Sequence, residues 1–173
     1  MDEFYTHEPN KLLKFIQKYI TNNDILIEPS CGDGSFLNIL KFTKCYDIIK
    51  KVDTDIFQCK DFLQINDIEP DACFIGNPPF GKNSKLAIEF CKHCCELKAK
   101  YIMFILPEVF KQDKYKIWHS INVIIYSKNT NTMNSSEMAK KLLLIVFSKY
   151  GNEKMKTERI QKLLTPNVNT LSI

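Results

Sequence analysis

The amino-acid sequence predicts an α/β fold in which a doubly wound, mostly parallel sheet carries an antiparallel hairpin at one edge. Short apolar runs alternate with amphipathic stretches along the chain, which is the pattern of parallel strands joined by helices. The last two apolar runs are joined by a single polar loop, which favours an antiparallel pair. Polar residues follow several of the runs, at the strand ends where such sheets bind their ligands.

The first half of the chain is expected to begin with an amphipathic helix at residues 9–19 and an apolar strand at residues 24–28. A loop of small residues with two glycines follows and leads into a helix at residues 35–42. A strand at residues 45–48 and a short extended segment at residues 56–60 come next. The unbroken apolar run at residues 72–76 is then expected to form a buried strand.

The second half is expected to begin with a helix at residues 85–98, because Leu86, Phe90, Cys94 and Leu97 recur at helical spacing. A strand at residues 101–106 and a short helix near residues 112–118 follow. Strands near residues 122–126 and 141–148 form the hairpin. The polar segment 128–137 is either its loop or a flap that faces a substrate.

A chain of 173 residues is expected to form one domain, with a core over about residues 1–150 and a tail at residues 151–173. The sequence has no apolar run long enough to span a membrane and no signal-peptide pattern, so a soluble, intracellular protein is predicted. Its seven cysteines then indicate reduced thiols. Cys91, His93 and Cys94 lie within one helical pattern and lack a second group of ligands, so no metal site is predicted.

The charge balance is mildly basic. A formal net charge of +4 is compatible with a nucleic-acid partner but does not require one. Nearly all of the positive charge comes from lysine, and Arg159 is the only arginine. Because arginine is the main reader of base edges in the major groove, strong intrinsic sequence specificity is not expected.

The clearest chemical signal is the turn Asn77-Pro78-Pro79-Phe80, which follows the predicted strand at residues 72–76. The two prolines fix the backbone and leave the carbonyl groups of the turn free to accept hydrogen bonds. Asn77 adds an amide oxygen, and Phe80 offers a ring on which a planar base can stack. The turn therefore indicates methylation of an amine on a planar base. The structural alternative is a turn that happens to carry a phenylalanine.

A second motif, with the sequence EPSCGDG, occupies residues 28–34 between the first strand and the following helix. Its glycines let the backbone approach a ligand closely, and the helix N-terminus would offer N–H groups to a carboxylate. The complete dinucleotide fingerprint GxGxxG is absent. The loop therefore favours a nucleoside with an amino-acid tail over a pyrophosphate-bearing cofactor.

Together, the two motifs resemble those of the S-adenosylmethionine-dependent N6-adenine methyltransferases of the Asn-Pro-Pro-Phe type, with a gamma-like motif order. The resemblance covers most of the chain and implies a Rossmann-like class I methyltransferase fold with S-adenosyl-L-methionine as cofactor. It implies that the turn Asn77-Pro78-Pro79-Phe80 is catalytic and that the substrate is DNA or RNA. Lys82 and Lys85, just after the turn, would contact backbone phosphates of that substrate.

The resemblance also implies a set of cofactor-binding residues along the chain. They are Tyr5, Thr6, Glu28, Ser30, Cys31, Gly32, Asp47, Ile48, Asp61, Phe62 and Asn77. Tyr5 and Thr6 would cap the methionine end of the cofactor. Asp47 would bind the ribose hydroxyls, and Asp61 would receive the adenine amino group.

Several of these assignments have alternatives in the sequence itself. Asp53 or Asp55 could replace Asp47 as the ribose ligand. Asp61 and Thr6 could each be no more than helix caps. Either Glu28 or Asp33 could hold an amino group of the cofactor, and we favour Glu28.

The chain also departs from the family that it resembles. DNA-modifying members usually carry a separate target-recognition domain, and no such domain is expected here. A partner subunit, an RNA substrate or low specificity would each account for this difference. Two further functions stay open: a catalytically silent, cofactor-binding subunit, and methylation of a protein glutamine, whose turn would carry tyrosine in place of Phe80.

Overall fold

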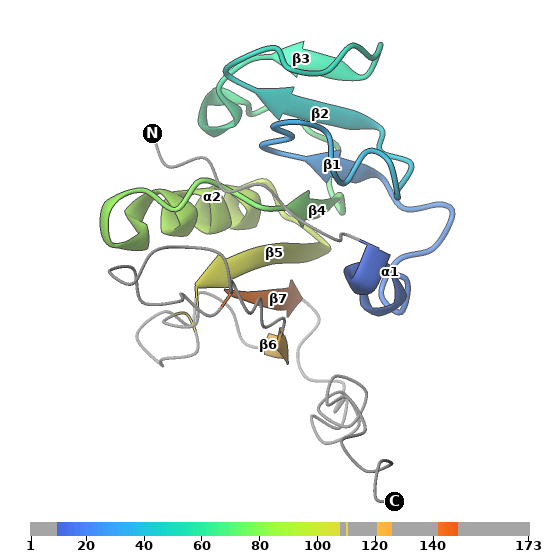
Figure 1. Cartoon of the computed structure of the whole chain (residues 1–173), viewed down its shortest axis with the longest axis vertical. Helices are drawn as coiled ribbons and strands as arrows, with labels where there is room; N and C mark the ends of the chain where they lie inside the picture. Colours follow the sequence, from blue (N-terminus) through green and yellow to red (C-terminus); the bar gives the residue numbers. More distant parts are fainter. Residues whose placement is uncertain (1–9, 108–109, 111–120, 126–141, 149–173) are drawn as a thin grey trace, which may run out of the picture.

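A computed structural model describes residues 10–107, 110, 121–125 and 142–148 of the chain. Within them, strands form one sheet in the order β3-β2-β1-β4-β5-β7-β6 (Figure 1). The strands are β1 (Leu26–Glu28), β2 (Lys44–Asp47), β3 (Phe57–Cys59), β4 (Cys73–Gly76), β5 (Tyr101–Pro107), β6 (Ile121–Ile125) and β7 (Leu142–Ser148). The helices are α1 (Asn10–Ile16) and α2 (Lys85–Glu96), with 3-10 turns η1 (Phe62–Gln64) and η2 (Lys82–Ser84).

The sheet is doubly wound. Strands β1 to β5 pair in parallel, whereas β7 pairs antiparallel with both β5 and β6. The chain runs from β1 outward through β2 to β3, then returns to β4 beside β1 and continues to β5. The order therefore reverses between β1 and β4, and ligands of such sheets bind beyond the carboxyl ends of the strands at that reversal. The mostly parallel α/β sheet predicted from the sequence is confirmed.

Two apolar layers cover the sheet. Alternate residues of a strand face opposite sides, so Phe74 of β4 packs in the layer that contains Phe90 of α2. Its neighbours Cys73 and Ile75 pack in the other layer, which includes Phe15 and Ile16. Figure 1 shows α2 and α1 beside different parts of the sheet. The core thus holds the ends of β1 and β4 rigidly from both sides.

One predicted helix is wrong. Residues 35–42 form turns, in which the Ile39 and Leu40 N–H groups both bond to the carbonyl of Phe36, at 3.0 and 3.1 Å. The Thr43 N–H then bonds to the Leu26 carbonyl of β1 at 2.8 Å. Because the chain must join the sheet by residue 44, it bends back before a second helical turn can form.

The other elements lie close to their predicted positions, and α1 and α2 end earlier than predicted. The predicted helix at residues 112–118, the polar segment 128–137 and the tail at residues 151–173 lie outside the described residues, as do Tyr5 and Thr6. No helix in the described part of the chain has the length and apolar character needed to cross a membrane.

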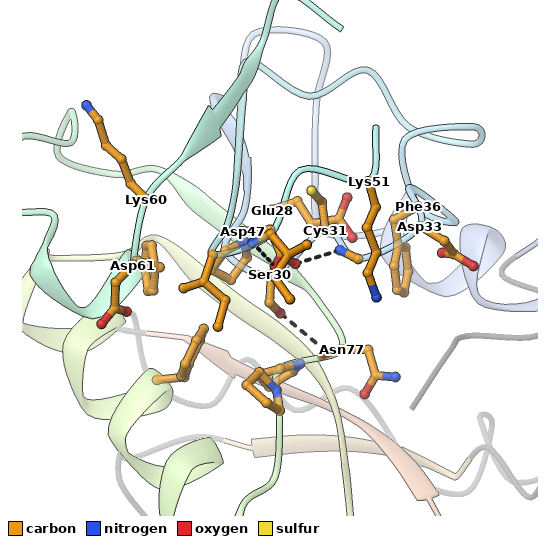
Figure 2. Close-up of a pocket in the computed structure, with 18 of the residues that line it drawn as sticks. Glu28, Ser30, Cys31, Asp33, Phe36, Asp47, Lys51, Lys60, Asp61 and Asn77 are labelled. Atoms are coloured by element: carbon orange, nitrogen blue, oxygen red, sulfur yellow. Dashed lines mark hydrogen bonds between the residues drawn. The ribbon is translucent and has the colours of Figure 1, made fainter. Parts of the chain in front are cut away.

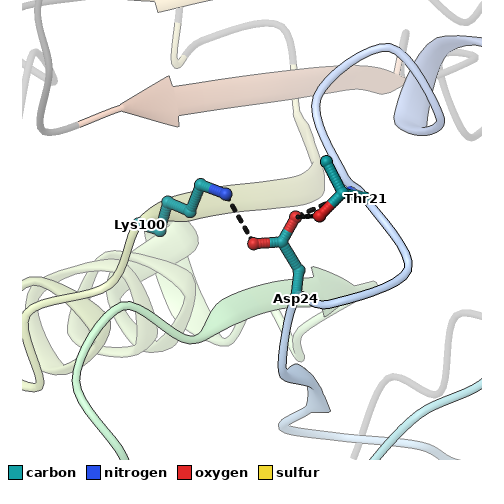
Figure 3. A network of polar contacts seen from close by, with 3 residues as sticks. All are labelled: Thr21, Asp24 and Lys100. Atoms are coloured by element: carbon teal, nitrogen blue, oxygen red, sulfur yellow. Dashed lines mark hydrogen bonds and ion pairs between the residues drawn. The ribbon is translucent and has the colours of Figure 1, made fainter.

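A polar cluster joins the amino ends of β1 and β5 (Figure 3). The Lys100 ammonium group donates to Asp24 Oδ1 at 2.5 Å, and the Thr21 N–H and hydroxyl donate to Asp24 Oδ2 at 2.6 and 3.0 Å. The Asp24 side chain is only 8% exposed, and that of Lys100 is 26% exposed. Burial acts to raise the pKa of Asp24, but these hydrogen bonds outweigh it and hold the pKa below its ordinary value.

Candidate functional site

A cavity of about 360 Å³ lies beyond the carboxyl ends of β1, β2 and β4, at the reversal of strand order (Figure 2). Its volume is within the range of small-molecule sites, which is about 300–1,000 Å³. Eleven of the predicted site residues line it: Glu28, Ser30, Cys31, Gly32, Asp47, Ile48, Asp61, Phe62, Asn77, Pro78 and Pro79. The structure therefore brings together residues that are up to about fifty positions apart in the chain.

Glu28, the last residue of β1, is a buried acidic residue of the cavity wall. Its side chain is 2% exposed, and its Oε2 atom has no hydrogen-bond partner within the described part of the chain. Burial, together with the charges of Asp33 and Asp47, raises the pKa of Glu28 well above its ordinary value. A buried carboxyl group without a partner is costly, so this end of the cavity fits a ligand that donates hydrogen bonds or carries positive charge.

Asp47, the last residue of β2, holds the glycine-containing loop in place. Its Oδ2 accepts the Gly32 N–H at 2.9 Å, and its Oδ1 accepts the Ile49 N–H at 3.1 Å. Gly32 has a φ of +51°, which an L side chain rarely adopts, and a Cβ there would meet no atom within 4 Å. The loop therefore presents bare backbone to open space, and each Asp47 oxygen keeps a lone pair for a ligand hydroxyl.

The alternatives to Asp47 do not share this position. Asp53 and Asp55 are exposed and are not part of the cavity wall. Asp53 instead pairs with Lys50 at 2.8 Å. The structure thus favours Asp47 among the three candidate ribose ligands.

Two exposed isoleucines follow Asp47 at the cavity rim. Ile48 and Ile49 are 53% and 47% exposed, and both line the cavity. Ile48 was predicted to contact the cofactor, whereas Ile49 was not. Large exposed apolar side chains beside a cavity suit the flat face of a purine ring.

Asp61 and Phe62 both line the cavity, Asp61 with an exposed carboxylate and Phe62 with a buried ring. Asp61 caps η1, because its Oδ1 accepts the Leu63 N–H at 3.0 Å, and its other oxygen stays available for a ligand. Phe62 is buried among the rings of Phe74, Phe90 and His93. Phe62 therefore forms the floor of the cavity as part of the core.

The Asn77-Pro78 turn faces the loop across the cavity, as Figure 2 shows. The Ser30 hydroxyl donates to the backbone carbonyl of Asn77 at 3.3 Å, which joins the turn to the glycine-containing loop. Asn77 and Pro79 are half-buried and Pro78 is buried. The turn is thus held in a fixed position beside Glu28.

Phe80 does not lie where a base could stack on it. Its side chain is 6% exposed, packs in the layer that contains α2, and is not part of the cavity wall. Its backbone carbonyl instead accepts the Leu86 and Ala87 N–H groups at 3.1 and 3.4 Å, at the start of α2. Burial of the apolar ring in the core is more favourable than its exposure at the cavity rim. The predicted stacking role of Phe80 would therefore require the ring to move.

The predicted phosphate-binding lysines lie apart from the cavity. Lys82 and Lys85 are exposed on the turn that leads into α2, and Lys85 is 3.9 Å from Glu89. Lys51 and Lys60 line the cavity instead. Nothing in the local sequence around Lys51 or Lys60 distinguishes them from other surface lysines, so the sequence alone does not identify them.

The cysteines do not form a metal site in the structure. Cys91 and Cys94 are buried on α2, and burial raises the pKa of both thiols. The described residues contain no group of three or more histidine, cysteine or acidic side chains placed to hold a metal ion. His93 Nε2 lies 2.8 Å from the carbonyl of Ile65 and serves the packing of α2 against η1.

Comparison with known proteins gives a sequence family and a common fold. Residues 19–144 match the EDM2 methyltransferase-like domain. The Arabidopsis thaliana protein ENHANCED DOWNY MILDEW 2 is 28% identical over 140 residues, which are 70% of this chain and 11% of that protein. The chain therefore spans about a tenth of the length of this relative.

Three solved structures illustrate the shared fold. The crystal structure of the 23S rRNA methyltransferase ErmE has a TM-score of 0.61 at 11% identity, covering 90% of this chain and 75% of that one. A Streptococcus mutans protein in complex with SAH has a TM-score of 0.51 at 17% identity, covering 84% and 99%. The human methyltransferase 10 domain containing protein has a TM-score of 0.52 at 10% identity, covering 85% and 84%. At these identities, the likeness establishes the fold.

Proposed function

This chain belongs to the EDM2 methyltransferase-like domain family, and from that premise we propose that it transfers a methyl group from S-adenosyl-L-methionine to N6 of adenine in a nucleic acid. One observation carries the proposal. The Asn77-Pro78 turn lines the same cavity as Glu28, whose Oε2 atom has no hydrogen-bond partner among the described residues. An acceptor site for an amine and a site for a cationic ligand thus lie side by side.

The cavity residues fit the cofactor. Glu28, which is buried and finds no partner for Oε2 in the part of the chain that the structure describes, would hold the ammonium group of the amino-acid tail. Asp47 would accept hydrogen bonds from the ribose hydroxyls, and Asp61 from the adenine amino group. The open space at Gly32 lets the cofactor lie directly against the backbone. When bound, S-adenosyl-L-methionine supplies an electrophilic methyl group on its sulfonium.

The chain's own contribution to the reaction is the turn. The N6 lone pair of adenine is delocalised into the ring, so the amine is a poor nucleophile. The Asn77 amide oxygen and the Pro78 carbonyl would accept its two N–H groups and favour tetrahedral geometry at the nitrogen. Positive charge develops on this nitrogen during transfer, so the two acceptors act mainly in the transition state. The proton that is then lost would pass to solvent through this polar turn.

The nucleic-acid assignment rests on several weaker observations. The chain is basic overall, with a formal net charge of +4. The structural neighbour ErmE is a 23S rRNA methyltransferase, which supports structured RNA among the candidate substrates. A partner subunit that recognises the target remains part of the proposal.

The test is methyl transfer from labelled S-adenosyl-L-methionine to single-stranded DNA, duplex DNA and structured RNA, with the methylated nucleosides separated by mass spectrometry. We expect N6-methyladenine in one of these pools. Asn77→Ala should lower the rate about 10²–10³-fold, the scale found when one transition-state hydrogen bond is removed. Its affinity for S-adenosylhomocysteine should stay within about threefold of that of the wild-type protein.

The matched control is Asn38→Ala, which removes the same side chain at an exposed position that does not line the cavity. This variant should retain full activity. Equal turnover of wild-type protein and Asn77→Ala would contradict the role of the turn.

A second candidate is a catalytically silent subunit that binds the cofactor and supports an active partner. The burial of Phe80 favours it, because the ring that should hold an extruded base is packed in the core. Cofactor binding without methyl transfer to any nucleic-acid pool would favour this candidate over the enzyme.

A further inference from the structure

The glycine-containing loop has little capacity left to bind an anion. An amino-acid tail carries a carboxylate, and the sequence predicted that a helix N-terminus after the loop would receive it. That helix is replaced by turns, and most N–H groups of the loop are already bonded within the chain. These are Cys31 to the Tyr46 carbonyl at 2.9 Å, Gly32 to Asp47 at 2.9 Å, Gly34 to the Cys31 carbonyl at 2.8 Å and Ser35 to Asp33 at 3.1 Å.

The charged side chains of the cavity are also unfavourable to a carboxylate. Four acidic residues line it: Glu28, Asp33, Asp47 and Asp61. Like charges repel, so a ligand carboxylate needs a cationic partner in this cavity. Two lysines are part of the described cavity wall, Lys51 and Lys60.

The two lysines point in different directions (Figure 2). The Lys51 side chain runs past the glycine-containing loop and brings its ammonium group to the side of the cavity where Asn77 lies. The Lys60 side chain extends away from the other labelled residues, toward the upper left of the view. Lys51 is thus the cation placed near the Glu28 end, where the proposed ammonium site lies.

We propose that Lys51 binds the carboxylate of the cofactor's amino-acid tail. This assignment rests on the proposed function, because it needs S-adenosyl-L-methionine in the cavity. Lys51 would then bind the carboxylate of the tail, and Glu28 its ammonium group. A lysine in the β2–β3 connection would do the work that a helix N-terminus does in other nucleotide sites.

The test is a two-by-two binding experiment by calorimetry, which does not depend on activity. Wild-type protein and Lys51→Met are each titrated with S-adenosylmethionine and with decarboxylated S-adenosylmethionine. For the wild-type protein, we expect loss of the carboxylate to weaken binding about tenfold, the lower end for a charge-assisted hydrogen bond at an exposed lysine. For Lys51→Met, binding of S-adenosylmethionine should be about tenfold weaker, with no further loss for the decarboxylated compound.

Lys60→Met is the matched control, because it removes the other cavity lysine. It should respond to loss of the carboxylate as the wild-type protein does. If Lys51→Met still binds decarboxylated S-adenosylmethionine about tenfold more weakly than S-adenosylmethionine, the assignment is overturned. Lys51 then serves only to balance the acidic side chains around it. Failure of the wild-type protein to bind either compound would instead contradict the proposed function, and the Lys51 assignment with it.

Discussion

Two acidic residues flank strand β1, and their surroundings are opposite. Asp24, before the strand, accepts hydrogen bonds from Lys100 and Thr21, and these keep its pKa below the ordinary value. Glu28, at the end of the same strand, is more deeply buried, and none of the described residues bonds to its Oε2. Its pKa is well above the ordinary value. The two carboxyl groups are separated by one short strand of the same sheet.

The difference separates the structural end of the sheet from its functional end. At the amino ends of β1 and β5, a carboxylate is used to hold two strands and a loop together. At the carboxyl ends, the described residues leave one oxygen of a buried carboxyl group without a partner, a cost that is retained where a ligand is to be bound. Variants at the two ends should therefore separate stability from cofactor affinity.

The largest effect is expected at the structural end. Lys100→Met removes the cation and leaves the Asp24 carboxylate, 8% exposed, with only the hydrogen bonds from Thr21. The free energy of unfolding should fall by about 2 kcal/mol, less than for a fully buried pair because Lys100 is partly exposed. Denaturant unfolding measures this loss, and calorimetry should show unchanged affinity for S-adenosylhomocysteine. A large loss of affinity would show that the amino ends of β1 and β5 also affect ligand binding.

Glu28→Gln, at the functional end of the sheet, should raise the free energy of unfolding instead of lowering it. A raised pKa means that the folded state holds a proton that the unfolded chain releases above its pKa of about 4.5, so stability from this residue falls as the pH rises. Glutamine does not titrate. The variant should be more stable than the wild-type protein by about 1 kcal/mol near pH 8, the usual gain when a strained functional group is relieved, and similar to it near pH 4.

The same variant should bind S-adenosylmethionine about tenfold more weakly, because the ammonium group loses a charged partner. Unfolding and titration on one preparation measure both changes. A variant that is less stable at both pH values, or that binds as well as the wild-type protein, would show that Glu28 is a structural residue like Asp24.

The smallest effect concerns the acid dependence of the Asp24 pair. The pKa of Asp24 is lowered from 3.8, so the ion pair with Lys100 stabilises the folded state above that value. This stabilisation is lost as the pH falls through the pKa of Asp24 in the folded state. The difference in unfolding free energy between wild-type protein and Lys100→Met should therefore shrink by roughly 1 kcal/mol between about pH 6 and about pH 2.5. A difference that stays constant over this range would mean that the lysine stabilises the sheet through its packing alone.

The sequence was sufficient for the sheet and for the strand-end residues, because both follow from local patterns. Glu28, Asp47 and Asn77 each follow an apolar run, and parallel strands bring such positions to one edge. It was not sufficient for residues 35–42, where the helical pattern competes with the need to rejoin the sheet at β2. Tertiary constraints of this kind leave no trace in local periodicity.

Side-chain direction was also beyond the reach of the sequence. Phe80 was expected to stack on a substrate base and is buried in the core, because a ring directly after two prolines can point to either side of the turn. Lys51 and Lys60 were not singled out, since a cavity wall made by the β2–β3 connection depends on how that connection folds back. The roles assigned to these residues remain predictions for the experiments above.

The hydrogen bonds from Leu86 and Ala87 to the carbonyl of Phe80 have a practical consequence. The first turn of α2 is closed by the last residue of the Asn-Pro-Pro-Phe turn, so the two segments open and close as one cooperative unit. Neither Pro78 nor Pro79 has an amide proton, which makes the turn itself nearly invisible to hydrogen exchange. The amide protons of Leu86 and Ala87 therefore serve as its reporters: their exchange rates should follow the opening of the turn as a whole, in the presence or absence of ligand.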